Sequence, residues 1–176
     1  MLLAGLLLTL AQAPAAVAGA ADPPERRACV AVEVTSPQDP SAPLHAPAFS
    51  ATRIIDLRMT AVVRAAPGRG VLRFKVYTPG GFLYQSLAAP YVVAPPGGHA
   101  VRLRTQVVDG FADPLREQEA VPAASREPSR YRVTGSLPVA GTLITTSGLY
   151  GVWTVEPWFQ DAARPCGPRQ AFVIKP

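Results

Sequence analysis

The sequence predicts an all-β protein, folded as an antiparallel β-sandwich of two sheets with seven to nine strands and one disulfide bond. Three observations lead to this fold class. Apolar and polar residues alternate with a period of two in several segments, as half-buried strands require. Turn-forming residues separate these segments roughly every eight to fifteen residues, a spacing typical of sandwiches. The chain also contains 20 prolines and 14 glycines, which disfavour long helices.

The first 20 residues are predicted to form a cleavable signal peptide. They carry no ionisable side chain, and an apolar run over residues 1–10 is followed by Ala-x-Ala motifs at Ala18–Ala20 and Ala16–Ala18. The apolar run is shorter than the roughly 20 residues that cross a bilayer. We therefore expect an exported protein, located in the periplasm, at the cell surface or outside the cell. The alternative is a buried N-terminal helix of the folded domain.

The rest of the chain has the length of one domain. Residues 21–28 are predicted to be a polar leader, and residues 29–176 a single domain. Its two cysteines, Cys29 and Cys166, lie near opposite ends of this domain, and an even cysteine count in an exported chain indicates a disulfide. Two free thiols are the alternative. A metal site is disfavoured, because two isolated cysteines without nearby histidines cannot complete a tetrahedral shell.

In the N-terminal half, the first strand is predicted at residues 29–34, before a proline-rich connection at residues 37–47. The clearest alternation covers residues 53–63, where five apolar side chains are expected on the buried face: Ile55, Leu57, Met59, Ala61 and Val63. A hairpin then joins residues 71–78 to residues 82–87 through a Pro-Gly-Gly turn. In its first strand Leu72, Phe74 and Val76 are expected to face the core.

In the C-terminal half, residues 91–93 and 99–107 are predicted to be strands, with Val101 and Leu103 facing inward. A long polar loop over residues 109–129 follows, in which residues 114–120 could form a short helix. The remaining predicted strands are residues 131–137, 142–146, 151–156 and 171–174.

Two segments resemble the Ig-like and fibronectin-III-like modules of bacterial secreted proteins. They are LRFKVYTPGGFLY, residues 72–84, and GLYGVWTVE, residues 148–156, the latter followed by a final AFVIK strand. The resemblance implies that Trp153 packs in the core with Val155, that Tyr150 begins its strand like a tyrosine corner, and that the disulfide ties the first strand to the closing hairpin. The chain departs from antibody domains in lacking their inter-sheet cysteine pair. The resemblance carries a fold and no active site.

We find no catalytic or cofactor motif in the sequence. It contains no Gly-x-Ser-x-Gly elbow, phosphate-binding loop or dinucleotide fingerprint. Its two histidines, His45 and His99, do not have the spacing of metal ligands. The chain is therefore predicted not to be an enzyme and to need no cofactor or metal. The alternative is a hydrolase with an unrecognised carboxylate pair, for example Asp109 with Glu156.

Basic residues alternate with apolar ones in three predicted strands. The candidate anion-binding residues are Arg73, Lys75, Arg102, Arg104, Arg130 and Arg132. If these strands shared a sheet, they would form one basic face able to bind anionic polysaccharide or lipopolysaccharide. The alternative is a solvated outer face that discourages aggregation through strand edges.

The leading functional prediction is a non-enzymatic binding or structural module of the cell envelope or exterior. It would recognise a protein partner through strand edges and loops, with Trp158 and Phe159 as candidate contact residues. Alternatively, Trp158 covers the core beneath the Pro-Cys-Gly-Pro turn. Anionic glycan is the second class of partner considered. Nucleic acid is not expected, because no stacking aromatics alternate with the arginines.

Overall fold

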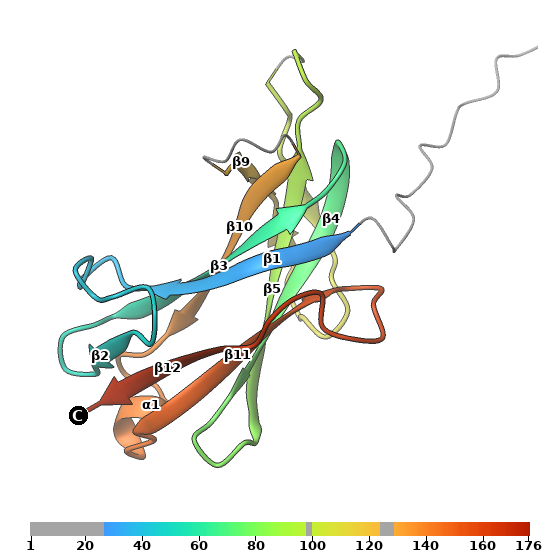
Figure 1. Cartoon of the computed structure of the whole chain (residues 1–176). Helices are drawn as coiled ribbons and strands as arrows, with labels where there is room; N and C mark the ends of the chain where they lie inside the picture. Colours follow the sequence, from blue (N-terminus) through green and yellow to red (C-terminus); the bar gives the residue numbers. More distant parts are fainter. Residues whose placement is uncertain (1–26, 98–99, 124–128) are drawn as a thin grey trace, which may run out of the picture.

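The computed structural model describes residues 27–97, 100–123 and 129–176 and is mostly β (Figure 1). The predicted signal peptide (1–20), most of the predicted leader (21–28) and His99 lie outside the described residues. The strands are β1 (Ala28–Thr35), β2 (Ala48–Ser50), β3 (Asp56–Arg64), β4 (Gly68–Tyr77), β5 (Leu83–Val93), β6 (Thr105–Gln106), β7 (Leu115–Arg116), β8 (Gln118–Glu119), β9 (Val121–Pro122), β10 (Arg130–Pro138), β11 (Gly151–Phe159) and β12 (Gln170–Lys175), with one short helix, α1 (Leu143–Thr146).

The strands form two main sheets. A four-stranded sheet has the order β1-β3-β10-β9, and a six-stranded sheet has the order β2-β12-β11-β4-β5-β8. A separate pair, β6-β7, lies in the long connection between β5 and β10. The β2–β12 and β5–β8 pairings are parallel, whereas the central pairings of both sheets are antiparallel. In Figure 1, β1 and β3 of the four-stranded sheet diverge from β11 and β12 of the six-stranded sheet toward the side where β2 lies.

The period-two pattern identifies the buried face of β4 correctly. Leu72, Phe74 and Val76 are fully buried, while Arg73 and Lys75 lie on the other face and are half-buried. This strand pairs with β5 through the predicted hairpin, with Phe74 opposite Leu87 and Leu72 opposite Ala89 in the ladder.

In β3, the predicted inward residues Leu57, Met59, Ala61 and Val63 are also fully buried. The prediction is wrong for Ile55, which was expected on the buried face but precedes the strand and is 64% exposed. The backbone bends at Ile55, just before β3, and its carbonyl accepts hydrogen bonds from Val139 and Ala140, the residues that follow β10.

Buried side chains from both main sheets belong to one hydrophobic core, and Trp153 is among its largest members. Its ring meets Tyr84 edge-on, with centroids 5.2 Å apart, and stacks on Phe172 at 6.3 Å. Its indole N–H donates to the Leu149 carbonyl at 3.0 Å, which satisfies the buried polar group. Val155 is fully buried as well, so both of these residues lie in the core.

Two predicted strands are wrong. Residues 142–146 form the α1 turn, because the Thr142 hydroxyl accepts from the Ile144 amide and so caps a helix start. Residues 101–104 are irregular, and only Thr105–Gln106 pair as β6. In both segments apolar and β-branched residues suggested a strand. Local hydrogen bonds hold residues 142–146 as a helical turn, whereas Arg102 and Arg104 bond to the distant residues Arg69 and Glu117.

The long connection closes one side of the core rather than forming a free loop. It contains β7, β8 and β9 but no helix at residues 114–120. Within a few residues, β8 pairs with β5 of the six-stranded sheet and β9 pairs with β10 of the four-stranded sheet. This short segment therefore connects the edges of the two sheets.

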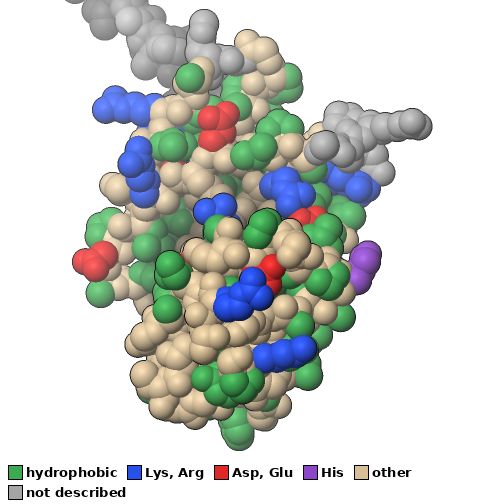
Figure 2. All heavy atoms as spheres, turned by 90° about the vertical axis from the view of Figure 1, so that its left-hand side faces the viewer, with side chains coloured by type: hydrophobic (Ala, Val, Ile, Leu, Met, Phe, Trp, Pro, Cys, Tyr) green, Lys and Arg blue, Asp and Glu red, His purple; other side chains and the backbone are tan. Residues whose placement is uncertain are grey.

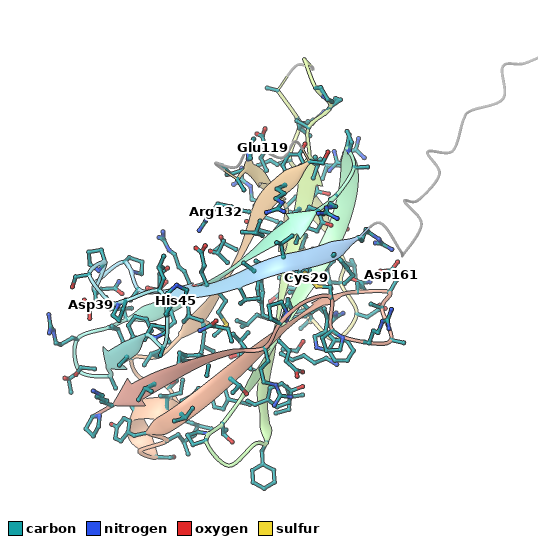
Figure 3. The ribbon with its side chains drawn as sticks, viewed as in Figure 1. Cys29, Asp39, His45, Glu119, Arg132 and Asp161 are labelled. Carbon is teal, nitrogen blue, oxygen red and sulfur yellow. A yellow bond between two sulfur atoms is a disulfide. The ribbon has the colours of Figure 1, made fainter. Side chains whose placement is uncertain are left out.

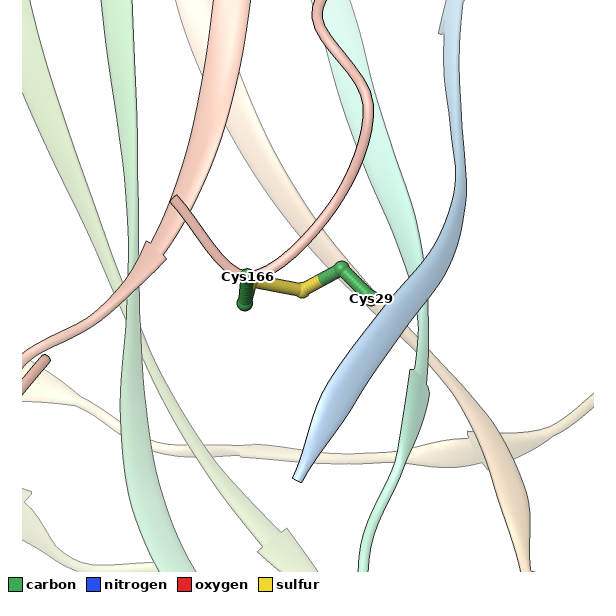
Figure 4. Close-up of a disulfide and its surroundings, with 2 residues drawn as sticks. All are labelled: Cys29 and Cys166. Carbon is green, nitrogen blue, oxygen red and sulfur yellow. A yellow bond between two sulfur atoms is a disulfide. The ribbon is translucent and has the colours of Figure 1, made fainter. Parts of the chain in front are cut away.

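The opposite side is closed by the predicted disulfide (Figure 4). The Cα atoms of Cys29 and Cys166 are 5.0 Å apart, and the Cys29 amide donates to the Cys166 carbonyl at 2.7 Å. Cys29 lies in β1 and Cys166 in the connection between β11 and β12, so the bridge joins the first strand to the final hairpin, as the resemblance implied. A Cβ at Gly167 would lie 2.3 Å from the Cys29 carbonyl oxygen, so only glycine permits this approach.

Candidate functional site: a cation–aromatic face on the six-stranded sheet

The six candidate anion-binding residues do not share one sheet. Arg73 and Lys75 lie in β4 of the six-stranded sheet, whereas Arg130 and Arg132 lie in β10 of the four-stranded sheet. Arg102 and Arg104 lie in the irregular segment before β6. The expectation of a single basic face is therefore wrong for this set, because alternation indicates the side of a strand but not the sheet to which it belongs.

Arg132 forms an ion pair within the four-stranded sheet (Figure 3). Its guanidinium forms a salt bridge with Glu33 of β1 at 2.5 Å, across the central strand β3. This pair joins β1 to β10, the two strands that flank β3, so Arg132 already has an ion-pair partner within the sheet.

Arg102 and Arg104 belong to a second ion-pair region, centred on Glu117. This glutamate is 4% exposed and accepts hydrogen bonds from the Arg69 side chain and from the Arg104 amide. Arg69 also donates to the Arg102 carbonyl. Burial alone would raise the pKa of Glu117, but the hydrogen bonds from Arg69 and Arg104 outweigh it and lower the pKa below its ordinary value. These contacts fix the chain before β6.

Arg73 and Lys75 belong to a different arrangement, with Glu156 of β11 at its centre. We define the cation–aromatic face by its six residues: Arg73, Lys75, Tyr77, Glu156, Trp158 and Arg169. In the β4–β11 ladder Lys75 is opposite Glu156 and Arg73 is opposite Trp158. Neighbouring positions of two paired strands therefore place these side chains together on the sheet surface.

Glu156 is 8% exposed and has hydrogen bonds on both carboxylate oxygens. Arg169 donates to Oε1 through Nε at 2.8 Å and through a terminal nitrogen at 2.5 Å, and the Tyr77 hydroxyl donates to Oε2 at 3.0 Å. The Trp158 indole N–H is near the same carboxylate but does not meet hydrogen-bond geometry. The negative charge of Glu156 is thus balanced by Arg169.

These contacts shift two pKa values in opposite directions. Burial alone would raise the pKa of Glu156, but the hydrogen bonds from Arg169 and Tyr77 outweigh it and hold the pKa below its ordinary value. Burial raises the pKa of the Tyr77 hydroxyl, and donation to Glu156 raises it further. At neutral pH the face therefore contains a charged glutamate and a neutral tyrosine.

Three cations of this face lie over aromatic rings. The Lys75 ammonium is 3.5 Å from the Trp158 ring centroid, and the Arg169 guanidinium is 5.6 Å from that of Tyr77. Arg73 lies 5.7 Å from the Phe111 ring and donates to the Asp109 carbonyl at 2.6 Å. Such contacts hold the cations close to the sheet, where they keep further N–H groups for a ligand.

Among the described residues, neither Arg73 nor Lys75 forms an ion pair. Since Arg169 and Glu156 balance each other, the face carries two uncompensated positive charges beside aromatic rings. This arrangement can attract a polyanion and offer a flat ring surface beside it.

The candidate partner-contact residues differ in accessibility. Trp158 is half-buried, with Lys75 over its ring, and Phe159 is 5% exposed and belongs to the core. Sequence reasoning missed Arg169 entirely. It lies three residues after Cys166, in a turn with no strand pattern, and reaches Glu156 only through the fold.

Of the carboxylate pair considered for a hydrolase, the Glu156 side chain is paired with Arg169. The backbone carbonyl of Asp109 accepts from Arg73. Across the part of the chain that the structure describes, no three His, Cys, Asp or Glu side chains group as metal ligands, and His45 is an exposed residue of the β1–β2 connection (Figure 3).

A shallow hollow lies beside the disulfide. Arg27 and Asp161 form a salt bridge at its rim, with nitrogen and oxygen 2.6 Å apart, and the Arg27 guanidinium also lies 5.2 Å from the Phe159 ring centroid. The hydrogen bond from Arg27 lowers the pKa of Asp161. The ion pair joins the chain before β1 to the turn after β11, next to the bridge between Cys29 and Cys166.

The helix α1 has four residues, and within the described ranges no helix is long and apolar enough to span a membrane. Comparison with known proteins returned no matching family model, no matching curated protein and no matching solved structure.

Proposed function

We propose that this protein is an exported, non-enzymatic binding module with an Ig-like or fibronectin-III-like sandwich fold, and that it binds an anionic polysaccharide through its cation–aromatic face. The observation that carries the proposal is the grouping of Arg73, Lys75 and Arg169 over aromatic rings with a single, already paired carboxylate. A disulfide that spans the domain favours an oxidising compartment outside the cytosol.

An anionic sugar polymer suits this face for two reasons. Its carboxylate or phosphate groups can pair with Arg73 and Lys75, which have no ion-pair partner in the described chain. Its ring faces can lie against the exposed part of Trp158, because sugar C–H groups pack on aromatic rings. Repeated weak contacts along a polymer then add up through multivalency.

The competing proposal is a protein partner bound through strand edges. β1 (Ala28–Thr35) forms one edge of the four-stranded sheet, while β9 and β8 cover only two residues each of β10 and β5. At the other end of the six-stranded sheet the edge strand β2 has only three residues, which leaves little backbone for a partner strand.

The test is binding to polygalacturonate at low and high salt, with dextran as the uncharged control polymer. We expect binding to polygalacturonate only, with affinity falling as salt rises. The double variant Arg73→Gln, Lys75→Gln should lose about tenfold or more in affinity, since two charge-assisted contacts are removed.

The matched control removes two charges elsewhere, with Arg53→Gln, Arg58→Gln at exposed positions near and in β3. If both double variants lose affinity equally, the binding is due to net charge and the proposed face is wrong. If salt-resistant binding to a protein from the envelope fraction is lost in the Arg73, Lys75 variant, the protein-partner proposal replaces it. A parallel titration with lipopolysaccharide separates phosphate-bearing from carboxylate-bearing ligands.

A further inference from the structure

Two segments that meet at one end of the molecule contain no charged residue. The chain has no Asp, Glu, Lys or Arg at residues 76–101 or at residues 133–155. The first segment contains the β4–β5 hairpin turn, and the second contains α1 and the start of β11. Figure 1 shows the hairpin turn and α1 at the same end, the lower end of the view.

Contacts join these segments into one surface. Gly151 packs against Pro79, since a Cβ at Gly151 would lie 3.1 Å from that ring. Behind them Trp153 contacts Tyr84 and donates to the Leu149 carbonyl, and the Leu149 amide donates to Ile144 of α1. The hairpin turn, the helix and the β11 start are therefore held together by a common core.

Large apolar side chains project from this surface. We call it the charge-free end and define it by four residues: Phe82 (76% exposed), Leu83 (55%), Leu143 (61%) and Val152 (56%). In Figure 2, where the same end again lies lowest, the visible face shows hydrophobic and uncharged atoms at the bottom, below the lowest Lys or Arg. Large exposed apolar residues on segments that meet at one end of a molecule favour contact with an apolar environment.

The polar groups of the charge-free end are largely satisfied within the chain. In the hairpin turn the Thr78 amide donates to the Phe82 carbonyl, the Gly81 amide to the Thr78 carbonyl, and the Phe82 amide to the Thr78 hydroxyl. Around α1 the hydroxyls of Thr145 and Thr146 both donate to the Thr142 carbonyl. These groups can leave water without losing hydrogen bonds, which is the condition for entering lipid.

This combination distinguishes a lipid surface from a protein partner. Protein interfaces surround an apolar centre with a polar rim that exchanges hydrogen bonds with the partner. Here the polar groups named above bond to their own chain. Lys175, an exposed residue, flanks the apolar residues: it follows Ile174, which is paired with Gly151, and so stands opposite the start of β11. A cation at the margin of an apolar surface can reach the headgroup layer with its ammonium group while its stem lies beside the acyl chains.

We propose that the charge-free end is a membrane-docking surface, which inserts Phe82 and its apolar neighbours shallowly into a lipid layer. The hairpin tip supplies the aromatic ring that favours the interface between headgroups and acyl chains. This inference does not depend on glycan binding, because the cation–aromatic face lies on the sheet and shares no residue with the tip.

The test uses protein as isolated from the cells that make it, with vesicles of pure phosphatidylcholine. In a Phe82→Trp variant we expect the added tryptophan to shift its emission to shorter wavelength with vesicles and to be quenched by lipids brominated on the acyl chain. The parent protein should respond less, since Trp153 is fully buried and Trp158 lies on the sheet. An unchanged Phe82→Trp spectrum would overturn the proposal.

Vesicle affinity gives a second readout. Phe82→Ser should weaken binding by about tenfold or more, the loss that follows from exposing one aromatic side chain to water. Val107→Ser is the matched control, because Val107 is 79% exposed but lies in the connection after β5. Binding should be independent of salt, in contrast to polygalacturonate binding, so either proposal can fail without the other. If Phe82→Ser instead abolishes self-association in sedimentation and leaves vesicle binding intact, the end is a dimer contact and the proposal is wrong.

Discussion

The side-chain amide of Gln118 pairs with the backbone of Thr134 in the way that a neighbouring strand would. Its oxygen accepts from the Thr134 amide at 3.0 Å, and its nitrogen donates to the Thr134 carbonyl at 2.7 Å. Gln118 itself belongs to β8, which pairs with β5 of the other sheet. One residue thus extends the coverage of the β10 edge beyond β9 and connects the two sheets.

Replacing Gln118 with alanine should therefore destabilise the protein. Two partly buried backbone groups lose their partner, and we expect the free energy of unfolding to fall by about 1–3 kcal/mol. Urea denaturation measures the change, and the Thr134 amide should exchange its hydrogen faster than in the parent. The control is Gln85→Ala at an exposed position of β5, which should change stability by less than about 0.5 kcal/mol. Equal effects in both variants would contradict the bridging role.

Breaking the disulfide should cost more than any single hydrogen bond. The bridge joins residues 137 positions apart, and closing so long a loop restricts the unfolded chain strongly. We expect the double variant Cys29→Ser, Cys166→Ser to lose about 2–5 kcal/mol in unfolding free energy. Comparing the parent in oxidised and reduced form provides the check. If the reduced parent is as stable as the oxidised one, this expectation fails.

Gly167→Ala should also destabilise the fold, because the new Cβ would lie 2.3 Å from the Cys29 carbonyl oxygen. The new Cβ would contact backbone, so the two chain segments around Cys29 and Gly167 must move apart. The hydrogen bond from the Cys29 amide to the Cys166 carbonyl must then lengthen. We expect a loss of about 1–3 kcal/mol, the usual range for overpacking. Ala163→Ser, at an exposed position of the same connection, is the control and should be neutral. Thermal denaturation of both variants with the disulfide intact measures the two effects, and an unchanged melting temperature for Gly167→Ala would contradict the expectation.

The Glu156 cluster predicts a specific loss of stability in acid. Because the folded-state pKa of Glu156 lies below its ordinary value of 4.5, the carboxylate stabilises the fold above that pH, and this contribution disappears as pH falls through the lowered pKa. In Glu156→Gln the slope of unfolding free energy against pH below about 4.5 should be shallower than in the parent. Urea denaturation at a series of pH values from 7 to about 2 measures the slope.

Glu33→Gln controls for the loss of one paired negative charge, since Glu33 also pairs with an arginine but its side chain is more exposed, at 24% against 11% for Glu156. Should Glu156→Gln leave the acid slope unchanged, the paired carboxylate does not contribute in the way described.

The sequence predicted local features well and the relations between distant segments poorly. The alternation of Leu72, Phe74 and Val76 identified both a strand and its buried face, because side-chain direction depends only on position along the strand. The even cysteine count was sufficient to predict the disulfide. Alternation did not reveal that Arg132 lies in a different sheet from Arg73, since strand order is set by contacts far apart in sequence.

The candidate site shows the same limit. Arg73 and Lys75 could be identified from their strand, but Arg169 could not, because it stands in a turn and reaches Glu156 through the β11–β12 connection. The Thr142–Thr146 segment looked like a strand from its β-branched residues. A helix cap formed by Thr142 outweighs that weak preference.

The position of the disulfide determines how the domain would carry a mechanical load. Cys29 stands at the start of β1, and Cys166 is ten residues from the last residue, Pro176. A pull between the residue before Cys29 and Pro176 passes through the sulfur–sulfur bond and then along β12 alone. The intervening strands stay outside the path of the force. Tension would be resisted by a covalent bond and by β12, which is hydrogen-bonded to β11 on one side and β2 on the other.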